Sequence, residues 1–219
     1  MPLTLPRAIL FDLDGTLADT APDLAAALNR VRAAHGLAPT PYELLRPVAS
    51  AGARGLIAAS FGLKPEDDGY DALRDAFLDT YEAYIAVESR LFDGIEELLT
   101  HLQKFNLSWG IVTNKAARFT DRLVPQIGLQ HAGCVISGDT TPHPKPHPAP
   151  LLEAARRLSL KPQDCWYVGD DLRDIQAGRA AGMTTIAAAW GYCGDAEPTT
   201  WDANALVNSP LELSNLVHA

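Results

Sequence analysis

The sequence contains little cysteine, and its cysteines are not arranged for bonding. The three residues, Cys134, Cys165 and Cys193, are odd in number and show no CxxC spacing. This argues against a disulfide framework and a cysteine-rich metal site. Cys134 and Cys165 stand in apolar runs, where a buried reduced thiol is the ordinary interpretation. A reducing compartment suits this pattern, so we expect a cytoplasmic protein.

Long hydrophobic segments and excess positive charge are also missing. No basic segment followed by a long apolar one is visible near the N-terminus, so we expect no signal peptide. The longest uncharged stretch, residues 180–194, is too short and too interrupted by glycine to span a bilayer. The formal net charge of −9 argues against nucleic acid or an anionic membrane as the main partner. A bound anion would need a local positive pocket.

The sequence does contain an alternation of apolar runs and helical patterns. With 219 residues, 47% of them hydrophobic, the chain is long enough for one large domain or a core with an insert. The apolar runs predict strands at residues 8–11, 107–112, 133–137, 165–168 and 184–188. The helical patterns lie at residues 95–104, 117–127, 149–158 and 175–181. This alternation favours an α/β fold with a parallel sheet covered on both faces.

Residues 21–89 break the alternation, because they show only helical patterns. Pro22 suits the first turn of a helix, and Thr20 is placed to cap it. Two apolar stripes follow at helical spacing, the first made of Leu24, Leu28 and Val31 and the second of Leu73, Phe77, Tyr81 and Ile85. We interpret both stripes as helix packing and predict a helical insert after the first strand.

Polar side chains follow the ends of the predicted strands. In chain order they are Asp12 and Asp14, then Thr113 and Asn114, then Lys145, and finally Asp170, Asp171 and Asp174. Because the carboxyl ends of parallel strands meet at one edge of a sheet, we expect these groups to converge on one crevice.

The stretch ILFDLDGTLADT places Asp12 and Asp14 only two residues apart, where two like charges make ionisation harder. Together with Asp170 they offer hard oxygen ligands that suit Mg²⁺, and such a cation cancels the repulsion. Thr113 can donate its hydroxyl to a phosphate oxygen, and Lys145 supplies positive charge. An aspartate that attacks a phosphate dianion is repelled by its negative charge, so the reaction needs both the metal cation and the lysine. Asp14 can then hold a proton, give it to the leaving alkoxide and take one from the attacking water.

Each of these signals has an ordinary alternative. A lone DxD occurs in many surface loops, Thr113-Asn114 can cap a strand end, and Lys145 can be a solvated loop lysine. GDDLRD can merely cap the helix that follows it. His143 and His147 flank the lysine, but loop histidines without a metal role are commoner. The presence of DxD, Thr113-Asn114, Lys145 and GDDLRD in one chain favours the functional interpretation of each.

The motifs DLDGT, TN, the lysine of KPHP, and GDDLRD resemble the four motifs of the haloacid dehalogenase superfamily in order and spacing. This resemblance covers the whole chain. It implies a doubly wound, Rossmann-like core formed by residues 1–17 and 90–219, with an all-helical cap formed by residues 18–89.

The resemblance also implies a role for each motif residue. These roles are the nucleophile for Asp12, the general acid/base for Asp14, phosphate binding for Thr113 and Asn114, the third-motif lysine for Lys145, a metal ligand for Asp170, and the second acid of the fourth motif for Asp174. Asp171 stands where many relatives have serine, so the division of labour among the fourth-motif acids stays open.

Asp14 indicates the reaction class, because the dehalogenases of the superfamily lack an acid there and this chain has one. A phosphatase is therefore expected. The stretches VASAGARGLIAASFGL and SRLFDGIEELL resemble bacterial phosphoglycolate phosphatases and N-acetylmuramic acid 6-phosphate phosphatases. The implied substrate is a small phosphorylated metabolite with a carboxylate, which Arg54 of the cap could reach. The alternative for Arg54 is a surface arginine at a helix start.

Two other functions remain open from the sequence. A phosphotransferase such as a sugar-phosphate mutase shares all four motifs. A non-catalytic regulator could retain the fold and bind a phosphorylated ligand, although the retention of Asp12, Asp14, Lys145 and Asp170 together disfavours it.

Overall fold

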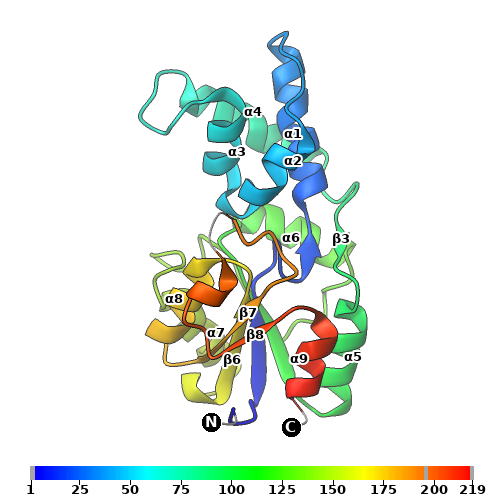
Figure 1. Cartoon of the computed structure of the whole chain (residues 1–219), viewed down its shortest axis with the longest axis vertical. Coiled ribbons are helices and arrows are strands. Elements are labelled where there is room, and N and C mark those ends of the chain that lie inside the picture. The colour runs from blue at the N-terminus through cyan, green and yellow to red at the C-terminus, as the bar shows by residue number, and fades with distance from the viewer. Residues whose placement is uncertain (1–2, 195–196, 218–219) are drawn as a thin grey trace.

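The sheet lies in the lower part of the molecule, and the described chain begins and ends near its base (Figure 1). The computed structural model describes residues 3–194 and 197–217. Within these residues, parallel strands form one six-stranded sheet in the order β5-β4-β1-β6-β7-β8. The strands are β1 (Ala8–Phe11), β4 (Ser108–Val112), β5 (Val135–Ile136), β6 (Cys165–Gly169), β7 (Thr184–Ala188) and β8 (Ala205–Val207).

Helices cover both faces of the sheet, as the alternation predicted. They are α5 (Ile95–Lys104), α6 (Ala117–Gln126), α7 (Ala149–Arg157), α8 (Leu172–Ala180) and α9 (Pro210–Leu216), with the short 3₁₀ helices η2 (Pro162–Asp164) and η3 (Pro198–Thr200). Successive strand residues point to opposite faces. Ile9 and Phe11 therefore belong to one buried cluster with α5 and α9, while Ala8 and Leu10 belong to another with α7. The α/β doubly wound architecture is confirmed.

A second group of helices lies above the carboxyl edge of the sheet (Figure 1). We call it the helical group; it consists of α1 (Ala21–Ala34), α2 (Tyr42–Leu45), the 3₁₀ helix η1 (Arg46–Ala51), α3 (Gly52–Phe61) and α4 (Tyr70–Ala83). Both predicted apolar stripes contribute to its packing, and Leu28, Phe77 and Tyr81 are almost fully buried. The helical interpretation of residues 21–89 is confirmed for its element type.

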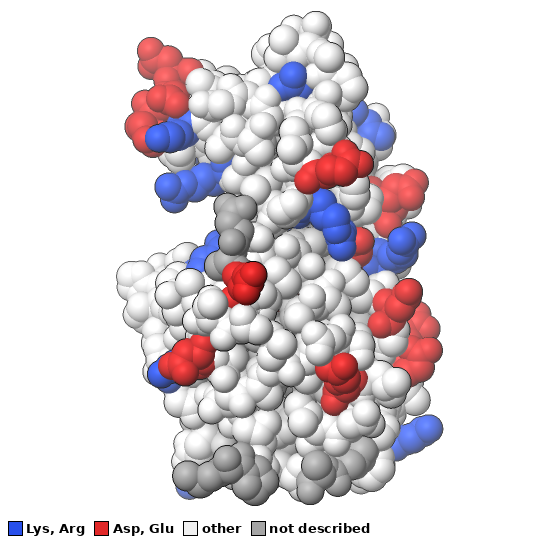
Figure 2. Space-filling view, viewed as in Figure 1, with Lys and Arg blue, Asp and Glu red and all other residues white. Residues whose placement is uncertain are grey.

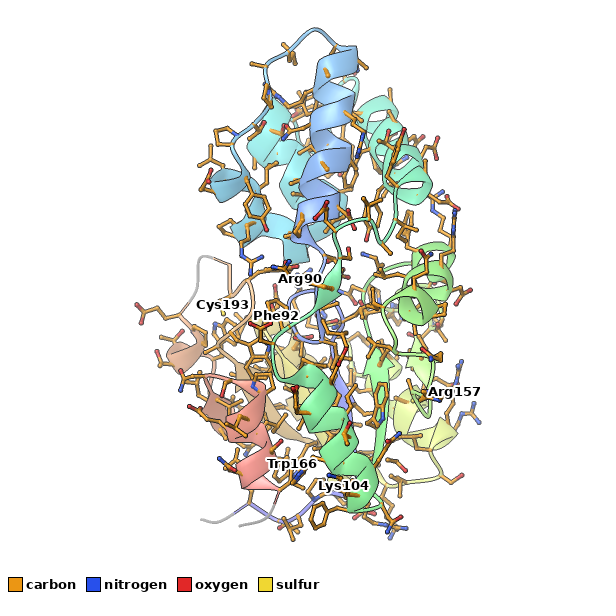
Figure 3. All side chains as sticks on the ribbon, turned by 90° about the vertical axis from the view of Figure 1, so that its right-hand side faces the viewer. Arg90, Phe92, Lys104, Arg157, Trp166 and Cys193 are labelled. Atoms are coloured by element: carbon orange, nitrogen blue, oxygen red, sulfur yellow. The ribbon has the colours of Figure 1, made fainter. Side chains whose placement is uncertain are left out.

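Two short antiparallel strands connect the helical group to the sheet. They are β2 (Ala18–Asp19) and β3 (Arg90–Leu91), in which Ala18 pairs with Leu91 and Asp19 with Arg90. Arg90 and Phe92 lie where the chain returns to the sheet (Figure 3). The surface in Figure 2 is indented on its left side at the level of this junction, and basic and acidic side chains are interspersed over the face shown.

Three local expectations differ from the structure. The Thr20 side chain does not cap α1, because its hydroxyl donates to Asp14 instead. Helix α8 begins at Leu172 and not at Ile175, because the Asp171 side chain caps it. The strand at residues 133–137 shortens to Val135–Ile136. β8 and α9 were not predicted, since their short apolar runs carry little periodicity. In the described part of the chain, no helix is both long enough and apolar enough to cross a bilayer.

Candidate active site

Asp12 follows β1 directly and is 7% exposed. Its backbone N–H donates to the carbonyl of Val168 at 2.9 Å, which fixes it beside the end of β6. Its Oδ1 lies 2.8 Å from Nζ of Lys145. Burial, helped by the charges of Asp174 and Asp14 and opposed by Lys145, raises the pKa of Asp12 to about 7. The site therefore resists a negative charge on Asp12 unless more positive charge is present.

Asp170 and Asp174 come to the same place from the end of β6 and the first turn of α8. One oxygen of each lies within 4.8 Å of one oxygen of Asp12 and of each other, and all three side chains are buried. Asp170 accepts hydrogen bonds from the hydroxyl of Thr16 at 2.7 Å and the backbone N–H of Tyr192 at 2.9 Å. Burial, with the charges of Asp12 and Asp174, holds the pKa of Asp170 well above its usual range. Three crowded hard oxygen donors fit a divalent cation.

Lys145 enters from the loop before α7 and is 4% exposed. Its Nζ donates to Oδ1 of Asp174 at 2.7 Å, to the hydroxyl of Tyr167 at 2.8 Å and to the carbonyl of Val112 at 3.0 Å. Burial alone would lower its pKa, but Asp12 and Asp174 hold the pKa of Lys145 above its usual value. The lysine is thus held as a buried cation beside the Asp12 carboxylate.

Thr113 and Asn114 follow β4, as predicted, and both line the cavity described below. The Asn114 side chain exchanges hydrogen bonds with the backbone of Lys145, because its Nδ2 donates to the Lys145 carbonyl and its Oδ1 accepts from the Lys145 N–H, both at 2.9 Å. Asn114 therefore positions the lysine loop. The hydroxyl of Thr113 accepts from the backbone N–H of Lys115 at 3.1 Å.

Asp14 points to a different set of partners from Asp12. Its Oδ1 accepts from Nζ of Lys115 at 2.8 Å and from the hydroxyl of Thr20 at 2.5 Å. It lies outside the cluster formed by Asp12, Asp170 and Asp174. The prediction that Asp14 binds the metal through its side chain stays a prediction, and the geometry brings Asp174 into the carboxylate cluster in its place.

The fourth-motif acids combine structural and site roles. Asp171 accepts from the backbone N–H of Arg173 at 2.9 Å, and Asp174 accepts from the backbone N–H of Asp171 at 3.1 Å, which forms a capping box for α8. The helix-capping alternative for GDDLRD is therefore realised by Asp171, while Asp170 and Asp174 turn toward Asp12.

A cavity of about 350 Å³ lies between these acids and the helical group. Its cationic lining residues are Lys115, Arg118, Lys145 and Arg173, and its larger apolar or aromatic ones are Leu24, Phe77, Leu78, Tyr81 and Phe119. Arg54 is exposed and is not among the lining residues. The cavity joins a charged floor from the sheet to an apolar wall contributed largely by the helical group.

Several site residues escaped the sequence reasoning. Lys115 directly follows Thr113-Asn114, so its position at a strand end was an available signal. Arg118 lies in the first turn of α6 just beyond it. Tyr167 and Tyr192 have mostly apolar neighbours in the sequence, and no local pattern there predicts a polar contact.

A family model described as haloacid dehalogenase-like hydrolase matches residues 9–188. An N-acetylmuramic acid 6-phosphate phosphatase of Pseudomonas putida is 45% identical over 213 residues, with 96% of each chain covered. A phosphoglycolate phosphatase of Xanthomonas campestris is 46% identical over the same length and coverage. Among solved structures, a predicted phosphoglycolate phosphatase of Haemophilus somnus has a TM-score of 0.84 at 23% identity, covering 97% of this chain and 98% of that one. That last likeness concerns the fold.

The match to the family model spans most of the chain, and it includes the strands that carry Asp12, Thr113 and Asp170. Both curated relatives align over almost their whole length. The chain belongs to the haloacid dehalogenase-like hydrolase family.

Proposed function

We propose that this protein is a Mg²⁺-dependent phosphomonoester hydrolase that forms an aspartyl-phosphate on Asp12. Its substrate is a small phosphorylated metabolite that bears a carboxylate. The observation that carries the proposal is the position of Asp12 in the cavity lining, with the buried cation of Lys145 2.8 Å away. The curated relatives named as phosphatases support the same activity.

The chain's own residues account for both halves of the reaction. Asp12 attacks phosphorus and forms the new P–O bond while the P–O bond to the alkoxide breaks. Asp14 gives its proton to the departing alkoxide oxygen, then accepts a proton from the water that attacks the aspartyl-phosphate, releasing inorganic phosphate and restoring Asp12. Lys145 offsets charge at the transferring group, and Asn114 holds its loop in place.

The crowded carboxylates of Asp12, Asp170 and Asp174 fit a divalent cation, and we propose Mg²⁺ because the donor set is all oxygen. When bound, Mg²⁺ supplies positive charge that lets Asp12 and the phosphate approach each other. Asp14 is retained in this proposal as a member of the metal site. Residues 18–89 serve as the cap over residues 1–17 and 90–219, and the free cysteines agree with the proposed cytoplasmic location.

The cavity favours the larger of the two substrates suggested by the relatives. 2-Phosphoglycolate has almost no apolar surface, whereas N-acetylmuramic acid 6-phosphate brings two methyl groups and a sugar ring. The wall that contains Phe77, Leu78 and Phe119 can cover such groups. Each buried methylene-sized group contributes about 0.8 kcal/mol. We therefore propose the phosphorylated amino-sugar acid as the better substrate.

The test is a comparison of both compounds with Mg²⁺ present, in which released inorganic phosphate is measured per substrate consumed. A ratio of one is expected for both, with the higher kcat/KM for the amino-sugar acid. Consumption without phosphate release would indicate a mutase, and no turnover of any phosphomonoester would leave only a ligand-binding regulator.

A further inference from the structure

Tyr192 connects the sheet to the helical group through its phenol. It lies in the loop that follows β7 and is 6% exposed. Its oxygen accepts from the backbone N–H groups of Thr20 at 2.7 Å and Ala21 at 2.9 Å, and its proton goes to Oδ1 of Asp19 at 3.0 Å. The phenol oxygen also lies 3.5 Å from the Thr20 hydroxyl, at the long limit of a hydrogen bond, so the three shorter contacts account for most of its bonding.

The Thr20 side chain does not cap its own helix, and the phenol of Tyr192 bonds the backbone there. The first N–H groups of α1 have no partner within the helix and need an outside acceptor. A threonine at this position ordinarily accepts from the N–H of the second or third helical residue. The phenol of Tyr192 accepts instead from the N–H groups of Thr20 and Ala21, so it holds the Thr20 backbone while the Thr20 hydroxyl donates to Asp14 at 2.5 Å.

The same residue also contacts the carboxylate cluster. The backbone N–H of Tyr192 donates to Oδ2 of Asp170 at 2.9 Å. Gly191 lies so close that a Cβ there would stand 2.3 Å from Cβ of Asp170. The loop is therefore pressed against Asp170 at one end and against the start of α1 at the other.

The ring of Tyr192 is held from both sides of the junction. The Arg46 guanidinium lies 4.9 Å from the ring centroid, and the same arginine pairs with Asp19 at 2.7 Å. The ring of Phe92 lies 6.3 Å away, and Figure 3 labels Phe92 and the neighbouring Cys193 at this junction. These ring contacts do not need the hydroxyl, so a phenylalanine would preserve them.

We propose that Tyr192 is a positioning residue for Asp14 that acts through Thr20. By accepting from the backbone N–H of Thr20, it holds this residue in the position from which its hydroxyl donates to the Asp14 carboxylate. Without the phenol oxygen, the N–H groups of Thr20 and Ala21 lose their acceptor and the Thr20 backbone is no longer fixed, so Asp14 loses one of its two fixed partners. This inference rests on the acid/base role proposed for Asp14.

The test uses two substrates that differ in leaving group, an alkyl phosphate and p-nitrophenyl phosphate. The variants are Asp14→Asn, Tyr192→Phe, Thr20→Val, Thr20→Ser and the double variant Tyr192→Phe with Thr20→Val. Only the alkyl alkoxide needs protonation as it leaves, so misplacing Asp14 affects that substrate more. Tyr70→Phe, which removes the phenol oxygen of another buried tyrosine but lies in α4, is the matched control and should leave both activities unchanged.

We expect Tyr192→Phe and Thr20→Val each to lower kcat for the alkyl phosphate about tenfold, a part of the ~10²–10⁴ that acid–base catalysis contributes. The loss on p-nitrophenyl phosphate should be clearly smaller. Thr20→Ser keeps the hydroxyl and should behave like the wild type. The double variant should lose no more than the worse single variant, because both changes break the same path.

Multiplicative losses in the double variant, or equal losses on both substrates, would overturn the proposal. If Asp14→Asn shows the leaving-group dependence and Tyr192→Phe does not, the positioning role is wrong and the acid/base role stands. If Asp14→Asn itself shows no such dependence, the acid/base role of Asp14 and the positioning role of Tyr192 are both wrong. Should Tyr192→Phe melt below the assay temperature, Thr20→Val and Thr20→Ser decide the matter, since equal behaviour of those two would also overturn it.

Discussion

The ammonium of Lys115 lies 2.8 Å from Oδ1 of Asp14, and both side chains are largely enclosed, at 7% and 14% exposed. Burial alone would lower the pKa of Lys115, yet the charge of Asp14 holds it above its usual value. The proposed acid/base thus faces a permanent cation at the edge of the cavity, and the two residues come from the ends of adjacent strands, β1 and β4. Each charge lowers the free-energy cost of enclosing the other, because the two opposite charges attract at this distance.

Replacing Lys115 with methionine should destabilise the protein by about 2–4 kcal/mol, because it leaves the Asp14 carboxylate buried without its cation. Urea unfolding measures the change. The double variant Lys115→Met with Asp14→Asn should be more stable than the sum of the single effects predicts. Additive effects would show that the two groups do not interact energetically.

Asp12→Asn should abolish turnover, since an amide cannot attack phosphorus. The loss should exceed the ~10²–10⁴ fold that acid–base assistance supplies. The measurement is steady-state phosphate release, with an unchanged urea midpoint or a higher one as the check on folding. Activity within tenfold of the wild type would remove Asp12 from the nucleophile role.

Asp14→Asn should still allow attack on a substrate with a good leaving group, but hydrolysis of the aspartyl-phosphate should become slow. Rapid-quench labelling with an aryl phosphate should then trap phosphate on Asp12 in the variant. The wild type, treated in parallel, should show much less label. A variant that accumulates no label and slows equally for all leaving groups would contradict the assignment.

Mg²⁺ should stabilise the protein more at pH 8 than at pH 5. The pKa of Asp12 is about 7 when folded against an ordinary 3.8. Its protonated form favours folding below 3.8, and this stabilisation is lost as the pH rises through about 7. A cation replaces the proton only where the carboxylates are ionised.

At one hundred times Kd the expected stabilisation at pH 8 is about 2.7 kcal/mol, which corresponds to a Tm increase of roughly 5–10 °C for a chain of this size. Thermal unfolding with EDTA and with Mg²⁺ at both pH values measures it. Asp170→Asn should remove most of the Mg²⁺ effect. An equal Tm shift at both pH values would argue against these carboxylates as the site.

Arg118→Ala should raise KM for the carboxylate-bearing substrate and spare turnover of p-nitrophenyl phosphate. Arg118 lines the cavity, and its pairings with Asp79 and Glu82 are long, at 4.0 and 3.7 Å. The expected loss is about 1.5–3 kcal/mol, the range for a hydrogen bond to a charged group.

Arg54→Ala is the matched comparison, because the sequence suggested this arginine as the carboxylate anchor while the structure places it outside the cavity lining. A KM effect confined to Arg54→Ala would restore the original expectation. A loss that strikes both substrates equally in Arg118→Ala would mean that this arginine supports the helical group and does not contact the ligand.

The sequence by itself determined the parts of the protein that depend on neighbouring residues. Apolar runs predict β1, β4, β6 and β7, because a strand buried on both faces must be apolar throughout. The acids that follow those strands converge because parallel strands end at one edge. Asp12, Lys145 and Asp170 could therefore be named before any coordinates were known, and the structure brings them together.

Only the tertiary structure decided which polar groups satisfy one another. Thr20 is a good cap by local rules, but its hydroxyl donates to Asp14, and a phenol 172 residues away accepts its backbone N–H. Lys115 meets Asp14 across 101 residues, which no local pattern encodes. Arg54 and Arg118 look alike in the sequence, and only the packing of the helical group over the sheet places Arg118 at the cavity. Such pairings depend on distance in space, because a buried donor bonds whichever acceptor the packing brings within about 3 Å.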